Sequence, residues 1–199
     1  MKYTRVRKDT TMKKALNRGQ NTEQDIGVKP NILTRNKANI LGIFAFILLM
    51  MGIIRIDILV ASNYKTGKQL KAWPIKEGQE FDIEYTHSVQ LTPVIERYTV
   101  DEGNHILLKE SYFHSYGAGL PATTPYEFEI TEDGFRIYDM NQVMDNLIYR
   151  TGAVKANHRI HIGQKTYFFL DFSEPREGIR FTAEKISLLS YLWRGYNND

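Results

Sequence analysis

Two hydrophobic patterns divide the chain. Residues 38–54 (ANILGIFAFILLMMGII) form an apolar run of 17 residues without a charged side chain, whereas apolar and polar residues alternate from Ile56 onward. A run that is apolar on every side is typical of a helix in lipid, and alternation with a period of two is typical of strands buried on one face. The patterns therefore predict one apolar helix followed by an all-β domain.

The alternating region consists of short segments rich in β-branched and aromatic residues, separated by turns that contain glycine. Because these connections are too short for crossover helices, the sequence favours an antiparallel sandwich or a partly closed barrel over a doubly wound α/β fold. Helical spacing occurs over Met140–Leu147 and Ala183–Leu192. The predicted strands are Ile56–Ser62, Gln69–Ile75, Glu80–Val89, Pro93–Asp101, His105–Phe113, Tyr126–Thr131, Gly134–Asp139, Leu147–Val154, His158–Ile162, Lys165–Asp171 and Gly178–Glu184.

The apolar run predicts a single N-terminal transmembrane helix over residues 38–55. At 1.5 Å per residue the run extends ~26 Å, close to the ~30 Å hydrocarbon core of a bilayer. Lys37 and Arg55 lie at its two ends, where their side chains can reach lipid headgroups. The alternative is a buried core helix, but such a helix normally carries a polar stripe and this run has none.

Charge predicts the orientation of that helix. Residues 1–37 contain ten Lys and Arg against three acidic side chains, and the remaining residues contain sixteen against twenty. Because basic flanks stay in the cytoplasm, we predict a basic, disordered cytoplasmic tail over 1–37 and an extracytoplasmic β-domain over 56–199 of a single-pass protein of the cell membrane. A cleaved signal peptide is the alternative, but no A-x-A site follows the run. The tail lacks any helix-turn-helix, zinc-finger or RNP pattern, so no nucleic-acid partner is expected.

Composition and spacing argue against several kinds of site. The chain has no cysteine, which excludes disulfides, a thiol nucleophile and Cys-ligated zinc. His158 and His161 are three residues apart, so in a strand they point to opposite faces and do not form a metal site. Neither G-x-G-x-x-G nor a Walker lysine occurs. We therefore expect no metal and no cofactor.

One predicted hairpin, Glu80–Tyr98, brings a histidine and a glutamate to facing positions. With its loop centred on Leu91-Thr92, His87 lies opposite Glu96, and Tyr98 shares their face. A neighbouring carboxylate favours the charged imidazole, as in a ligand-binding or general-acid pair. The structural alternative is a cross-strand pair that only stabilises the hairpin.

Ser88 directly follows His87 and suggests a hydrolase with a serine nucleophile. Adjacent residues of a strand point to opposite faces, however, so the imidazole of His87 is not placed to activate Ser88. The chain also has no G-x-S-x-G elbow. Ser88 is therefore a candidate for binding rather than for catalysis.

A glycine-rich loop, His114–Pro121 (HSYGAGLP), follows the fifth predicted strand. Consecutive backbone amides of such a loop can surround an anion. Tyr116, Gly117 and Gly119 are therefore candidate binding residues. The alternative is a wide turn in which the glycines only relieve strain.

Two motifs carry a family resemblance. The segment FDIEYTHSVQLTPVIERY (Phe81–Tyr98) is followed by GAGLP (Gly117–Pro121), and together they resemble the bacterial domain-of-unknown-function family eighteen-fifty. The resemblance implies a small extracytoplasmic domain behind one membrane anchor, often encoded beside TRAP transporters of the TAXI type, which import organic acids. It implies no established activity and no catalytic residue. The matching positions are His87, Ser88, Pro93, Glu96 and Gly117–Pro121.

We therefore expect a membrane-anchored extracytoplasmic accessory or binding protein that contacts a TRAP-TAXI transporter component or a small organic anion. Two alternatives remain open: an envelope hydrolase with a His/Glu pair as acid and base, and a structural envelope interaction module. No nucleophile, metal cage or cofactor loop can be assembled from the residues, which favours binding over catalysis. The candidate binding residues are His87, Ser88, Glu96, Tyr98, Tyr116, Gly117 and Gly119.

Overall fold

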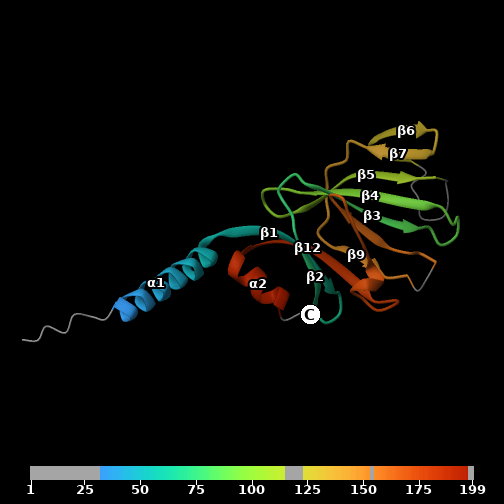
Figure 1. Ribbon diagram of the computed structural model, residues 1–199. Helices are drawn as coiled ribbons and strands as arrows, with labels where there is room; N and C mark the ends of the chain where they lie inside the picture. Colours follow the sequence, from blue (N-terminus) through green and yellow to red (C-terminus); the bar gives the residue numbers. More distant parts are fainter. Residues whose placement is uncertain (1–31, 115–122, 153–154, 197–199) are drawn as a thin grey trace, which may run out of the picture. The chain divides into compact units, whose positions relative to one another are not determined.

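The computed structural model describes residues 32–114, 123–152 and 155–196 (Figure 1). The chain divides into two units, residues 1–43 and 44–199, which are considered separately. Helix α1 (Ile32–Ile53) begins in the first unit, inside the segment predicted as a tail, and residues 1–31 of that tail lie outside the described residues. Among the described residues, no helix combines the length and the apolar character needed to cross a membrane.

The domain that follows α1 is built of antiparallel strands, which confirms the predicted all-β class. The structure differs from the prediction in the two segments with helical spacing. Met140–Leu147 contains a short strand instead, and Ala183–Leu192 is divided at Ser187 between the last strand and a helix. The elements are β1 (Arg55–Asn63), β2 (Gln69–Pro74), β3 (Glu80–Thr86), β4 (Pro93–Val100), β5 (Ile106–Phe113), β6 (Glu127–Thr131), β7 (Gly134–Tyr138), β8 (Gln142–Val143), β9 (Leu147–Arg150), β10 (Arg159–Ile162), β11 (Lys165–Phe168), the 3-10 turn η1 (Phe169–Asp171), β12 (Gly178–Ser187) and α2 (Leu188–Tyr196).

The strands form two sheets. The smaller has the order β2-β1-β12-β9, and the larger has the order β11-β10-β3-β4-β5-β7-β6, with β8 paired to β5. β1 pairs with β12 along its full length, from Arg55↔Ser187 to Asn63↔Ile179, so the first and last strands are neighbours (Figure 1). The two sheets are separate and share one core, which fits a sandwich and not a closed barrel.

The main core lies between the two sheets and is rich in aromatic residues. Phe81 on β3 stacks on Tyr98 on β4, with ring centroids 5.3 Å apart. From the smaller sheet, Leu59 and Phe181 enter the same core. On β3 alternate side chains such as Phe81 and Ile83 enter this core, as the alternating pattern predicts.

β1 departs from the alternating pattern because both of its faces are covered. Leu59 and Ala61 enter the main core, whereas Ile58 and Val60 join Ile186 in a second, smaller cluster. Tyr191 of α2 packs on that second cluster. A strand buried on both faces needs a continuous apolar run, which is the reason for the sequence ILVA at residues 58–61.

Candidate functional site

The predicted pairing of His87 with Glu96 is wrong. β3 ends at Thr86, and Glu96 pairs with Ile83. The loop 87–92 is centred two residues earlier than expected. Because the loop holds an even number of residues and the shift is also even, the strand residues keep their predicted faces although their partners change.

His87 lies in the turn rather than in the strand. Its Nδ1 accepts hydrogen bonds from the backbone N–H groups of Val89, at 3.3 Å, and Gln90, at 3.1 Å. The backbone N–H of Leu91 also donates to the carbonyl of His87 at 2.9 Å, and Leu91 has a φ of 56°. Ser88 is exposed in the same turn. The imidazole therefore supports the turn, and the acid–base pair of the hydrolase hypothesis loses its geometric basis.

Glu96 and Tyr98, two of the predicted site residues, do come together in the interior. The phenol of Tyr98 donates to Glu96 Oε2 at 3.3 Å, and the phenol of Tyr149 donates to the same oxygen. The two phenol oxygens are 2.7 Å apart. Glu96 and Tyr98 belong to the larger sheet and Tyr149 to the smaller one, so this Glu96 cluster is a polar link between the sheets.

Burial dominates the electrostatics of the Glu96 cluster. Loss of solvent raises the pKa of Glu96, although the hydrogen bonds from Tyr149 and Tyr98 act in the opposite direction. Burial, together with the nearby Glu96 charge, also raises the pKa of Tyr98, Tyr149 and Tyr85. The tyrosines therefore remain protonated donors at physiological pH.

His158 lines the same interior region, and His161 lies on the other side of the sheet. The His158 ring stacks on Tyr85, with centroids 5.3 Å apart, and on Phe169, at 5.4 Å. Its burial lowers its pKa. His161 Nε2 instead lies 3.0 Å from Glu84 Oε2. Within the described residues no group of three potential ligands is arranged to hold a metal ion.

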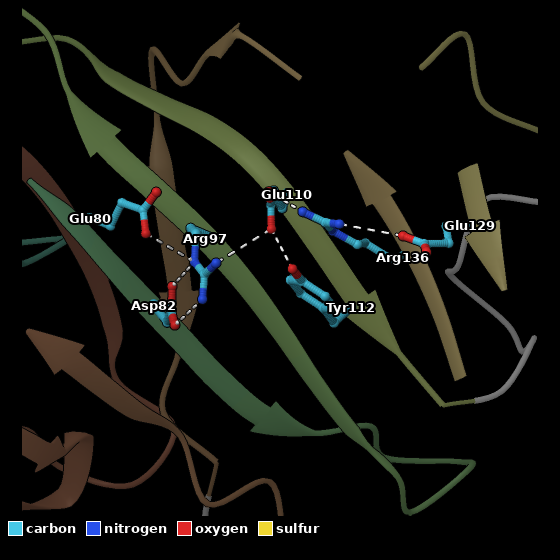
Figure 2. A network of polar contacts seen from close by, with 7 residues as sticks. All are labelled: Glu80, Asp82, Arg97, Glu110, Tyr112, Glu129 and Arg136. Carbon is cyan, nitrogen blue, oxygen red and sulfur yellow. Dashed lines mark hydrogen bonds and ion pairs between the residues drawn. The ribbon is translucent and has the colours of Figure 1, made fainter. Parts of the chain in front are cut away.

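A band of ion pairs crosses the outer face of the larger sheet (Figure 2). At its centre Arg97 forms a bidentate pair with Asp82, with Nε–Oδ1 at 2.9 Å and Nη2–Oδ2 at 3.2 Å. Arg97 also lies 3.5 Å from a carboxylate oxygen of Glu80 and 3.5 Å from one of Glu110. One guanidinium thus connects three acids on β3 and β5 across β4.

The band continues toward the β6 edge through Arg136. Its Nη2 donates to Glu110 Oε1 at 2.6 Å, and its Nη1 donates to Glu129 at 3.4 Å. The Arg136 guanidinium carbon lies 4.6 Å from the centre of the Tyr138 ring and 5.5 Å from that of Tyr112, distances typical of cation–π contacts. Burial opposes ionisation of Glu110, but hydrogen bonds from Tyr112 and Arg136 outweigh it and hold its pKa below the ordinary value.

Toward β10 the same face carries Glu84 of β3, which is paired with both Arg159 and His161 of β10. Burial of Glu84 would raise its pKa, yet these two partners lower it. This face could not be predicted from the assumed register, which does not bring Asp82 opposite Arg97 as the structure does. We call the following set the charged band: Glu80, Asp82, Glu84, Arg97, Glu110, Tyr112, Glu129, Arg136, Arg159 and His161.

The remaining predicted site residues, Tyr116, Gly117 and Gly119, lie outside the described residues.

The family resemblance of the sequence extends over a defined part of the chain. Residues 81–169 match a family model described as Domain of unknown function (DUF1850). The predicted family resemblance is confirmed. The DUF1850 match runs from β3 to η1 and contains the Glu96 cluster and all of the charged band except Glu80.

Neither the curated proteins nor the solved structures contain a match to this chain. The DUF1850 match leaves out α1, β1, β2, β12 and α2. Three of the four strands of the smaller sheet therefore lie outside the family segment, although they complete the core on which its strands pack.

Proposed function

We propose that the protein is a membrane-anchored accessory protein that binds a protein partner through the charged band. The observation that carries this proposal is the fixed arrangement of the partly exposed Arg97 and Arg136 beside Tyr112 on the outer face of the larger sheet (Figure 2). Arginine and tyrosine are enriched at protein interfaces and among their hot spots. Because neighbouring acids already hold both guanidinium groups, little side-chain entropy is lost when a partner binds.

The charge of the band indicates the kind of partner. Five acidic side chains face three arginines, and the acids at its margins are the most accessible: the side chains of Glu80 and Glu129 are 59% and 50% exposed, against 31% for Arg97. The excess of acid favours a partner with a basic surface and disfavours a small organic anion. We therefore favour a protein over a small organic anion as the binding partner of the charged band.

We further propose that residues 38–54 anchor the chain in the cell membrane, with the tail in the cytoplasm and the β-domain outside. Side chains along α1 are exposed although they are large and apolar, including Ile40 at 66% and Phe44 at 58%. The run of 17 residues is near the lower limit of ~17 residues for a spanning helix. Lys37 and Arg55 flank it at headgroup depth.

An anchor would confine the charged band to the membrane surface and hence to partners in the same membrane. A component of a TRAP-type organic-acid transporter is the partner we propose, because it matches the context that the family resemblance implies. The Glu96 cluster then has a structural role, since its hydrogen bonds join the two sheets inside the sandwich.

Co-purification from membranes tests this proposal. The full-length protein is cross-linked in cells, and transporter components that co-purify are measured by quantitative mass spectrometry. Glu129→Lys reverses an exposed charge of the band, and Arg136→Gln removes a central cation. Loss of a hot-spot contact worth about 2 kcal/mol corresponds to an about 30-fold weaker association.

The matched control is Glu77→Lys, which makes the same charge reversal at an exposed position in the turn between β2 and β3. Circular dichroism verifies that each variant is folded. Capture of transporter components by the wild type and by Glu77→Lys, with a strong reduction in the two band variants, supports the proposal. Equal capture by all four proteins, or no transporter component with the wild type, contradicts it.

A further inference from the structure

Helix α2 begins where the apolar run ends. The backbone N–H of Leu188 donates to the carbonyl oxygen of Ile54 at 2.9 Å. Arg55, the next residue, pairs with Ser187 at the end of β12. The start of α2 is therefore fixed beside the last residue of the segment proposed above as the membrane anchor.

The two faces of α2 differ in chemistry. One face packs on the smaller sheet, where Tyr191 contacts the cluster of Ile58, Val60 and Ile186. The opposite face carries large apolar side chains that are exposed to solvent. Their exposed fractions are 40% for Leu189, 49% for Leu192 and 70% for Trp193.

A cavity of about 480 Å³ lies beside this exposed face. Three of its lining residues are basic and none is acidic, and the others are apolar apart from one serine. Such a volume is within the range of small-molecule sites, ~300–1,000 Å³. The lining residues are Arg55, Lys185, Ile186, Leu189, Ser190, Trp193 and Arg194.

Two of these cations also contact acids. Lys185 lies 3.3 Å from Asp57, and Arg194 Nη1 donates to Glu184 at 2.9 Å. A guanidinium has five N–H donors, so one bond from Arg194 leaves others for a second acceptor. With Arg55 included, the cations exceed these acids by one charge.

From this arrangement we infer that α2 lies in the membrane interface and that the cavity binds the phosphate-bearing headgroup of an anionic phospholipid. The inference rests on the proposed membrane anchor, because the anchor brings α2 to the bilayer surface. Tryptophan is enriched at the level of the headgroups, and exposed leucines of an amphipathic helix enter the acyl region. The cations beside them are placed to pair with lipid phosphate.

Tryptophan fluorescence can test the inference because the chain has two tryptophans. Trp73 is 4% exposed and Trp193 is 70% exposed. The full-length protein is reconstituted into vesicles of phosphatidylcholine alone or of an equimolar mixture with phosphatidylglycerol, both with brominated acyl chains that quench nearby indoles. Flotation of the same vesicles reports on the anchor independently.

We expect strong quenching in the mixed vesicles, and we expect Trp193→Phe to abolish most of it. In the mixed vesicles Lys185→Gln and Arg194→Gln should each lower the ratio of quenched to unquenched Trp193 about five-fold, because a cation near the surface is worth ~1 kcal/mol. The matched control is Lys76→Gln, at an exposed position outside the cavity, and it should leave that value unchanged.

The outcomes separate the two proposals. A protein that does not float contradicts the anchor and, with it, the role of α2. A protein that floats without quenching of Trp193 overturns the role of α2 while the anchor stands. Equal quenching with and without phosphatidylglycerol, unchanged values for both cation variants, or displacement by free glycerol phosphate overturns the headgroup site.

Discussion

Tyr149→Phe removes one hydroxyl group from the link between the two sheets. That hydroxyl donates to Glu96 and lies 2.7 Å from the Tyr98 phenol oxygen. The substitution keeps the ring, which contacts Phe169 and Phe181 with centroids 6.2 and 6.3 Å away. The variant therefore isolates the hydrogen bond from the packing of the aromatic side chain.

The magnitude follows from the charge of the acceptor. A hydrogen bond to an ionised group contributes ~1.5–3 kcal/mol. After the substitution, Glu96 Oε2 loses the hydrogen bond from Tyr149 and keeps the one from Tyr98 at 3.3 Å. At a pH above the folded pKa of Glu96, we expect the free energy of unfolding to fall by about 2 kcal/mol. For a domain of 150–250 residues this corresponds to a decrease in Tm of ~4–8 °C.

The effect should depend on pH with a definite sign. Loss of the Tyr149 donor raises the pKa of Glu96 further, because that hydrogen bond opposes the effect of burial. At a pH below the folded pKa, Glu96 is protonated and the lost bond is a neutral one worth ~1 kcal/mol. The destabilisation is therefore smaller in acid and larger as the pH rises through the folded pKa.

Urea unfolding of the full-length protein in detergent, followed by near-UV circular dichroism in mild acid and in mild base, measures both values. Tyr64→Phe is the matched control, since the Tyr64 side chain is 48% exposed and its ring lies over Arg180, a contact that phenylalanine preserves. If Tyr149→Phe is as stable as this control, or if its destabilisation is the same at both pH values, the role assigned to the Glu96 cluster is wrong.

Two further predictions address the same hairpin. Because the folded pKa of Glu96 is raised, the stabilising contribution of this side chain is complete below the ordinary pKa of 4.5 and is lost as the pH rises through the folded pKa. Glu96→Gln should therefore flatten the decline of the free energy of unfolding with pH, as measured by urea unfolding. A decline as steep as in the wild type would contradict the raised pKa of Glu96. His87→Ala removes the acceptor of two turn amides and should lower stability by ~0.5–1.5 kcal/mol at neutral pH, as thermal unfolding can verify; an unchanged Tm would contradict the role of this imidazole in the turn.

The strands could be predicted from sequence because alternation is a local property. β1, β4 and β12 begin within one residue of their predicted starts. The helix α2 was harder to predict because the residues before it, up to Ser187, continue the strand β12. Pairing with β1 extends β12 to that point, and a partner more than a hundred residues away leaves no trace in a local pattern.

Part of the candidate site was also predictable. Glu96 and Tyr98 were assigned to one face because side chains alternate, and an even shift of register preserves that assignment. The pairing of His87 was wrong because the sequence offers two loop centres of the same parity, and contacts of the His87 ring with the turn amides favour the earlier one. Tyr149 was missed since it is 53 residues from Glu96 and belongs to the other sheet.

The sequence by itself determined where most strands lie and that their side chains alternate between two faces, because both follow from the two-residue period of the backbone. Only the tertiary structure decided which strands are neighbours. Glu110 accepts hydrogen bonds from both Arg97 and Arg136 because β5 lies between β4 and β7. That order results from packing both sheets around one core, and burial of the whole set of apolar faces sets it rather than any single segment.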